Sequence, residues 1–192
     1  MLKTYITYKS IILVSWATLM TVWFVLAFNV KQDIRSGHFS VWMQYLLRFT
    51  GAALIIVAVA RIGNGVFTAI FAPPITLGWI GALLTALGIA LAIWARLSLG
   101  RNWSARLSVK VNHQLVTTGP YAYVRHPLYT GVVLAAFGTM LTGMIFGIVE
   151  FIAACAIVAS RIKKEERDML ELFPDQYPEY KKKTCGLIPF IW

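Results

Sequence analysis

Long uncharged stretches dominate the pattern of this chain and predict helices that cross a membrane. Residues 10–30 carry no charge over 21 positions, which is enough for a helix to cross a hydrocarbon core about 30 Å thick. Two further apolar stretches, 41–60 and 75–95, have similar lengths. Pro73-Pro74 marks the start of the second of these, because proline does not fit easily inside a helix.

The stretch from 128 to 160 is too long for one membrane helix. Its 33 residues contain a single charge, Glu150, and as one helix they would extend about 50 Å. A break near Thr142-Gly143 would give two antiparallel helices, so the chain is predicted to have five spans. A carboxylate inside a span is a candidate functional group. Glu150 lies away from the polar end of the hairpin, so we expect a protonated or water-paired structural glutamate.

Two segments are too polar to be spans. Residues 97–123 mix polar and aromatic positions, as at a membrane interface. Residues 161–180 alternate apolar positions with charges, which predicts an amphipathic helix continuing from the last span. The sequence thus predicts an all-α integral membrane protein, with a three-span region at 1–97. A second region at 98–192 holds the hairpin, the C-terminal helix and the candidate chemistry.

The distribution of charge supports a membrane protein and not a nucleic-acid-binding one. The chain is 58% hydrophobic and has a net charge of +10, and its cations cluster beside apolar stretches without a soluble basic domain. Of the 18 Lys and Arg residues, 12 lie within 96–125 or after 160. An excess of Lys and Arg marks the cytosolic side, so both segments are predicted to face the cytosol as a cap. The two cysteines predict neither a disulfide nor a metal site.

The start of the predicted hairpin has the features of an anion site. Pro127 suits the first position of a helix, whose free N–H groups and positive dipole end would lie beside Arg125 and His126. Gly119-Pro120 predicts a turn that folds residues 113–116 back over this helix end.

A candidate site for a cation follows the hairpin and complements the anion site at its start. Arg161 and Glu165 are four residues apart, and therefore on one face of a helix, and Glu165 can offer a negative charge to a cation. S-adenosylmethionine carries a carboxylate, an ammonium and a sulfonium, and would satisfy both features. A Rossmann pocket is not predicted, because Gly63-Asn64-Gly65 does not continue as a phosphate-binding loop.

These residues also form a specific pattern. H-x-L-V-x-x-G-x-Y-x-x-x-R-H-P-x-Y, at 113–129, is followed by R-x-x-x-E-E at 161–166 and F-x-x-x-Y-x-x-Y at 173–180. The combination resembles the isoprenylcysteine carboxyl methyltransferase family, and the segment at 99–104 resembles its short prokaryotic members. The resemblance extends from Leu99 to the end of the chain. One departure is Pro174, where the family often has glycine.

The resemblance implies S-adenosylmethionine as cofactor and assigns roles to individual residues. Arg161 would face the substrate, and Arg161 and Glu165 are the catalytic candidates. Taken singly, each charged or aromatic residue has an ordinary explanation as an interface anchor, but their joint order favours a site. The predicted cofactor-binding residues are His113, Leu115, Val116, Tyr121, His126, Tyr129 and Glu165 from the family pattern, and Gly119, Arg125 and Pro127 from the turn and the helix start.

The expected activity is carboxyl methylation of a lipid-like, isoprenylcysteine-type acceptor. An ionised carboxylate needs no base, and Arg161 could orient it. Phospholipid N-methylation or small-thiol S-methylation are alternatives, with Glu165, Glu166 or a histidine as the base. An NADPH-dependent sterol-type reductase or a non-enzymatic membrane subunit remain further alternatives. The expected location is the prokaryotic inner membrane, with the site and the C-terminus in the cytosol and with membrane lipids, but no nucleic acid, as partners.

Overall fold

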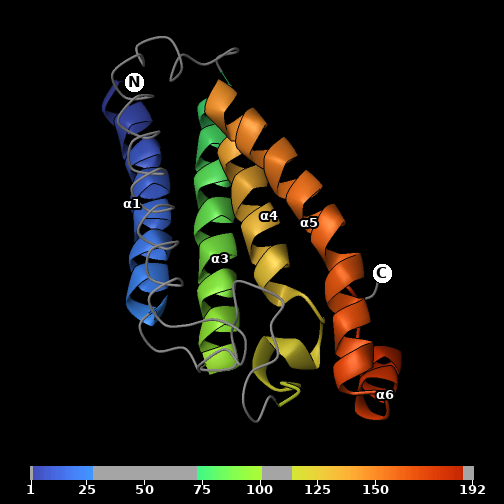
Figure 1. Cartoon of the computed structure of the whole chain (residues 1–192). Helices are drawn as coiled ribbons and strands as arrows, with labels where there is room; N and C mark the ends of the chain where they lie inside the picture. The colour runs from blue at the N-terminus through green and yellow to red at the C-terminus, as the bar shows by residue number, and fades with distance from the viewer. Residues whose placement is uncertain (1, 28–72, 101–113, 188–192) are drawn as a thin grey trace, which may run out of the picture.

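The computed structural model describes residues 2–27, 73–100 and 114–187, and within them the chain is all helical (Figure 1). Two long helices come first and a helical hairpin follows, with short helices near one end of the bundle. The elements are α1 (Leu2–Ala27), α3 (Ile75–Leu99), the 3-10 helix η2 (Gly119–Ala122), α4 (Pro127–Met140), α5 (Ile145–Leu172) and α6 (Gln176–Lys183).

Three of the described helices are long and apolar enough to cross a membrane. They contain the segments Tyr8–Leu26, Ile75–Leu99 and Ile145–Leu172. Helix α4 has 14 residues, about 21 Å at 1.5 Å per residue, and is shorter than the hydrocarbon core. The predicted span at 41–60 lies outside the described residues.

The helix boundaries confirm two of the predicted breaks. Helix α3 begins at Ile75, directly after Pro73-Pro74. The hairpin turns between Met140 and Ile145, where Gly143 has a positive φ of 75°. Glycine adopts this backbone conformation without the steric cost that a side chain adds, which explains why the long apolar stretch divides there.

The prediction of one amphipathic helix up to residue 180 was wrong. Helix α5 continues from the membrane segment but ends at Leu172, and a turn separates it from α6. Phe173 has φ −132° and ψ 62°, outside the helical region. The ring of Pro174 disfavours the helical conformation of the residue before it, which accounts for the break.

Helices α3 and α4 pack backbone against backbone through small residues. A Cβ atom added to Gly88 would lie 2.5 Å from the Gly131 oxygen and the Ala135 nitrogen, and one added to Gly138 would lie 2.5 Å from the Gly81 oxygen. Membrane helices that lack side chains at such positions approach closely and gain van der Waals contact. This closely packed pair joins the predicted regions 1–97 and 98–192.

A methyl group at this interface should destabilise the bundle. Alanine favours helix more than glycine does, so a loss of stability in Gly88→Ala would report the packing and not helix propensity. We expect a loss of about 1–3 kcal/mol, because the Ala135 and Gly131 backbones must move apart. Thermal unfolding in detergent measures it. Leu87→Ala, at an exposed position next to it, is the control; an equal or larger loss there would contradict the packing argument.

Helix α1 joins this pair through a few specific contacts. Tyr8 is buried against Gly78 of α3, and the Trp16 indole N–H donates to the Thr139 hydroxyl of α4 over 3.1 Å. At the other end, the buried Arg96 donates to the Leu26 carbonyl over 3.1 Å. Helices α1 and α3 therefore run in the same direction.

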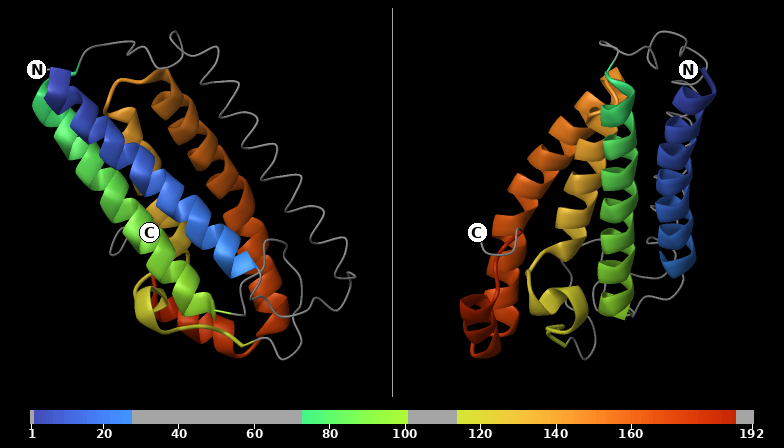
Figure 2. Two further views of the ribbon diagram at one scale, coloured as in Figure 1. Left: turned by 90° about the vertical axis from the view of Figure 1, so that its left-hand side faces the viewer. Right: turned by 180° about the vertical axis from the view of Figure 1, so that it is seen from behind.

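Helix α5 leaves the bundle at an angle. It starts beside α4, where Gly147 lies against Thr139, and diverges from α3 and α4 toward the end where η2 and α6 lie (Figures 1 and 2). The start of α4, the polar part of α5 and the short helices are thus gathered at the same end as the C-termini of α1 and α3.

Candidate cofactor site

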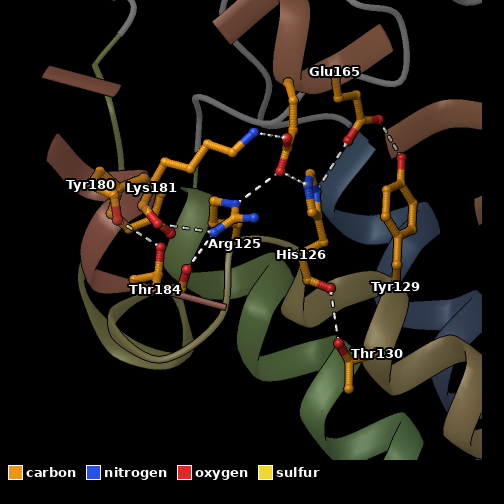
Figure 3. A network of polar contacts seen from close by, with 9 residues as sticks. Arg125, His126, Tyr129, Thr130, Glu165, Tyr180, Lys181 and Thr184 are labelled. Carbon is orange, nitrogen blue, oxygen red and sulfur yellow. Dashed lines mark hydrogen bonds and ion pairs between the residues drawn. The ribbon is translucent and has the colours of Figure 1, made fainter. Parts of the chain in front are cut away.

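Polar side chains from two helices converge at the start of α4 (Figure 3). His126 precedes the first residue of α4, and Tyr129 lies one turn further along. Glu165 and Glu166 approach them from α5, after its apolar part. The fold therefore brings together two segments that are some 40 residues apart in the sequence, as the motif had predicted.

His126 lies between the two carboxylates. Its side chain is 8% exposed, with Nδ1 3.7 Å from Glu165 Oε2 and Nε2 3.6 Å from Glu166 Oε1. Its ring stacks on Tyr129 with centroids 5.9 Å apart. Within the part of the chain that the structure describes, Nε2 is buried without a hydrogen-bond partner. Burial lowers the pKa of His126 to about 4, so the ring is neutral at physiological pH.

Glu165 is held by a neutral group. The Tyr129 hydroxyl donates a hydrogen bond to Oε1, and the carboxylate side chain is 22% exposed. Arg161, one turn earlier on α5, is exposed, and its positive charge acts on both Glu165 and Tyr129. Glu165 therefore combines a fixed orientation with access to solvent, which suits a carboxylate that meets a cationic ligand.

Glu166, in contrast, is bound by two cations. Its Oε1 accepts from Arg125 Nε over 2.8 Å, and its Oε2 accepts from Lys181 Nζ over 2.6 Å. The Arg125 guanidinium also donates through Nη1 to the carbonyl oxygens of Lys181 and Thr184. Arg125, one of the predicted cofactor-binding residues, is thus engaged with α5 and with the segment after α6.

The chain after α6 runs beside the residues that lead into α4. The Arg125 N–H donates to the Cys185 carbonyl over 2.8 Å, and the His126 N–H donates to the Gly186 carbonyl over 3.1 Å. The Thr130 hydroxyl donates to the Leu187 carbonyl over 2.6 Å. We call residues 184–187 the C-terminal strap. Its carbonyl groups fix the backbone of His126. Because these contacts join backbone groups, no motif of side chains could have revealed them.

The aromatic pattern at 173–180 has a packing role. Tyr177 and Tyr180 are 2% and 9% exposed, and the Tyr180 hydroxyl donates to the Tyr121 carbonyl over 2.7 Å. Burial raises the pKa of Tyr180 to about 12, which keeps this donor protonated. These contacts hold α6 against η2 and so place the C-terminal strap beside His126.

The remaining predicted residues divide into three groups. Gly119 has a φ of 63°, a conformation that favours glycine, and a Cβ atom there would lie 2.8 Å from Ser98 Oγ of α3. Tyr121 and Pro127 are buried at this end of the bundle, whereas Leu115 and Val116 are partly buried in the segment before η2. His113 lies outside the described residues.

Glu150 lies in the second turn of α5, at the opposite end of the bundle from this site. Its Oε2 is buried, with no hydrogen-bond partner among residues 2–27, 73–100 and 114–187. Glu150 is therefore far from His126, Tyr129 and Glu165, and its structural role stays a prediction. The same described ranges contain no group of three residues suited to bind a metal ion.

Comparison with known proteins shows which proteins resemble the segment that holds these residues. Residues 80–171 match the model of the isoprenylcysteine carboxyl methyltransferase (ICMT) family. Protein-S-isoprenylcysteine O-methyltransferase of Schizosaccharomyces pombe is 38% identical over 109 residues, which are 55% of this chain and 46% of that protein. Protein-S-isoprenylcysteine O-methyltransferase B of Arabidopsis thaliana is 32% identical over 59% of this chain and 61% of its own length. In these and similar matches the chain spans about half the length of the relative.

A solved structure supports the match at the level of the fold. The eukaryotic intramembrane Ras methyltransferase ICMT aligns with a TM-score of 0.52 and 25% identity, over 82% of this chain and 55% of the solved chain. The matched segment, 80–171, includes most of α3, all of α4 and nearly all of α5, and therefore His126, Tyr129, Glu165 and Glu166. The family model, the relatives and the fold agree that residues 80–171 of this chain are similar to the isoprenylcysteine carboxyl methyltransferase family.

Proposed function

We propose that the protein is an S-adenosylmethionine-dependent methyltransferase that methylates the carboxylate of an isoprenylcysteine-type lipid acceptor in the membrane. The observation that carries the proposal is the meeting of His126, Tyr129 and Glu165 across α4 and α5, inside the segment that matches the family. The curated relatives named above are protein-S-isoprenylcysteine O-methyltransferases, which supports the choice of acceptor.

The residues at this end of the bundle fit the cofactor. Glu165 is a partly exposed carboxylate that suits the cationic part of the ligand. His126 has a buried nitrogen without a partner among the described residues, beside the start of α4, where free N–H groups suit a carboxylate. The neutral ring of His126 adds no positive charge to a site for a cation.

The chain's own residues would act mainly by positioning. When bound, the cofactor would supply a methyl group attached to a positively charged sulfur, and the sulfur would leave as a neutral thioether on the side opposite the acceptor. Tyr129 fixes Glu165, the C-terminal strap fixes His126, and Arg161 would orient the acceptor carboxylate. Because an ionised carboxylate is already a nucleophile, no general base is needed, and catalysis would rest on orientation and on exclusion of water.

The membrane arrangement belongs to the same proposal. We infer five spans, with η2, α6 and the polar part of α5 forming a cytosolic cap in a prokaryotic inner membrane. The parallel direction of α1 and α3 supports the second span, which lies outside the described residues. The orientation rests on the 12 clustered cations.

A labelling experiment tests this orientation. A cysteine at position 183 should react with an impermeant reagent only after the cytosolic face is opened. Labelling in intact cells would show that the orientation is the reverse of the one proposed.

A binding experiment and an acceptor panel test the function. Purified protein should bind S-adenosylmethionine in calorimetry, and methyl transfer should occur to a prenylcysteine with a free carboxylate but not to its methyl ester. Transfer to an aminolipid or a small thiol would replace the proposed acceptor with one of the alternatives. Absence of cofactor binding would refute the methyltransferase proposal and leave the reductase and the non-enzymatic subunit.

A further inference from the structure

The proposed cofactor poses an electrostatic problem for this protein. The chain has a net charge of +10, and Arg125, Lys181 and Arg161 all lie around the site that would receive a positively charged sulfonium and ammonium. Like charges in a partly buried site repel strongly, because the surroundings screen them less than water does. A site for such a ligand therefore needs local negative charge beyond the net balance of the chain.

The two adjacent carboxylates differ in what they neutralise. Glu166 is 16% exposed and is bound on both oxygens by cations, Arg125 at 2.8 Å and Lys181 at 2.6 Å. Glu165 accepts a hydrogen bond from the uncharged Tyr129 hydroxyl. Both oxygens of Glu166 are therefore bound to cations, whereas Glu165 receives a hydrogen bond from a neutral donor and the charge of the exposed Arg161 acts on it from one helical turn away.

The two ion pairs of Glu166 lie directly beside the candidate site. Its Oε1 lies 3.6 Å from His126 Nε2, and the same oxygen accepts the Arg125 hydrogen bond. The side chain of Arg125 is 11% exposed, so solvent screens its charge poorly. Without Glu166, an uncompensated guanidinium and ammonium would remain next to His126.

We propose, on the basis of the proposed function, that Glu166 is a positioning residue that neutralises Arg125 and Lys181 and so makes the site selective for a cationic cofactor. Glu166 does not itself contact the cofactor in this proposal. Its contribution is to remove repulsion and to keep Arg125 attached to the C-terminal strap. Glu165 remains the counter-charge of the ligand.

Comparison of two ligands isolates the charge. S-adenosylhomocysteine lacks the transferred methyl group and the sulfonium charge but keeps the rest of the cofactor. Glu166→Gln, which preserves the shape of the side chain and one of its two acceptor oxygens, should weaken binding of S-adenosylmethionine about tenfold, the size expected for a nearby unit charge in a partly screened site. Binding of S-adenosylhomocysteine should change much less. Calorimetry on the full-length protein in detergent measures both, and an equal loss for the two ligands would overturn the proposal.

A second substitution separates charge from structural support. If Glu166 acts by neutralisation, removal of Lys181 in Glu166→Gln/Lys181→Met should recover part of the lost affinity for S-adenosylmethionine. If Glu166 only holds α6 in place, the double variant should bind as weakly as the single variant or more weakly. The deficit of Glu166→Gln should also shrink at high salt, since screening reduces repulsion from the half-exposed Lys181.

Lys181→Met alone keeps the proposal testable if Glu166→Gln does not fold. It should increase the preference for S-adenosylmethionine over S-adenosylhomocysteine, because Glu166 then has one cation fewer to balance. A decrease would contradict the proposal. Lys182→Met is the matched control, since Lys182 pairs with Glu179 at 2.6 Å on an exposed face of α6, and it should leave the preference unchanged. A parent protein that binds neither ligand would refute the proposed function, and not this inference alone.

Discussion

Glu165→Gln is expected to weaken binding of S-adenosylmethionine by about 1.5–3 kcal/mol, or one to two orders of magnitude in Kd. The variant keeps the size of the side chain and its capacity to accept the Tyr129 hydrogen bond, but it removes the negative charge. A positive ligand in a partly buried site would then lack its counter-charge. Calorimetry with the purified protein measures the change.

Two further variants make this result specific. Glu171→Gln, at an exposed position on the same helix, should leave Kd unchanged. Lys181→Met should change the affinity of Glu165→Gln only by as much as it changes that of the parent, because Lys181 is bound to Glu166 and not to Glu165. An unaltered Kd in Glu165→Gln would remove Glu165 from the cofactor site.

Arg161→Ala is expected to lower turnover by at least tenfold while cofactor affinity stays close to that of the parent. Arg161 is exposed and lies one helical turn before Glu165, on the same face of α5. If it orients the acceptor carboxylate, its loss affects the geometry in which the methyl group moves, which reduces kcat and not ligand binding. Single-turnover methyl transfer and calorimetry separate the two quantities.

The identity of the cation should matter at this position. Arg161→Lys should restore turnover poorly, because a lysine ammonium lacks the planar pair of donors with which a guanidinium holds a carboxylate. The charge of Arg161 also acts on Glu165, so a second explanation exists. An equal loss of cofactor affinity in Arg161→Ala and Glu165→Gln would mean that Arg161 serves only to hold Glu165.

Much of the fold followed from the sequence because membrane helices have strong local signals. Apolar length predicted α1 and α3, Pro73-Pro74 predicted the start of α3, and Thr142-Gly143 predicted the turn of the hairpin. The end of α5 was missed although its cause, Pro174, is equally local. The alternation of apolar and charged residues around it favoured a helix, and the conformation that proline imposes on Phe173 was decisive.

The proximity of the candidate site residues was predictable where a pattern of side chains indicated it. The order of His126, Tyr129 and Glu165 in the chain indicated a common site, and the fold brings them together. The contacts of the C-terminal strap were not predictable, because they join backbone groups whose identity leaves no motif. The different roles of the neighbouring Glu165 and Glu166 also required geometry, since their sequence context is almost the same.

The strap also sets an order of events during synthesis. Helices α1, α3 and α4 contact one another through residues up to Thr142, so this bundle can pack while later residues are still being translated. The His126 N–H, however, finds its partner in the Gly186 carbonyl, which lies after α6. The nascent chain would therefore be inserted and packed before the candidate site is complete. Ligand present during translation could stabilise this site only after residues 185–187 have been added, since shorter lengths lack the carbonyl groups of the C-terminal strap.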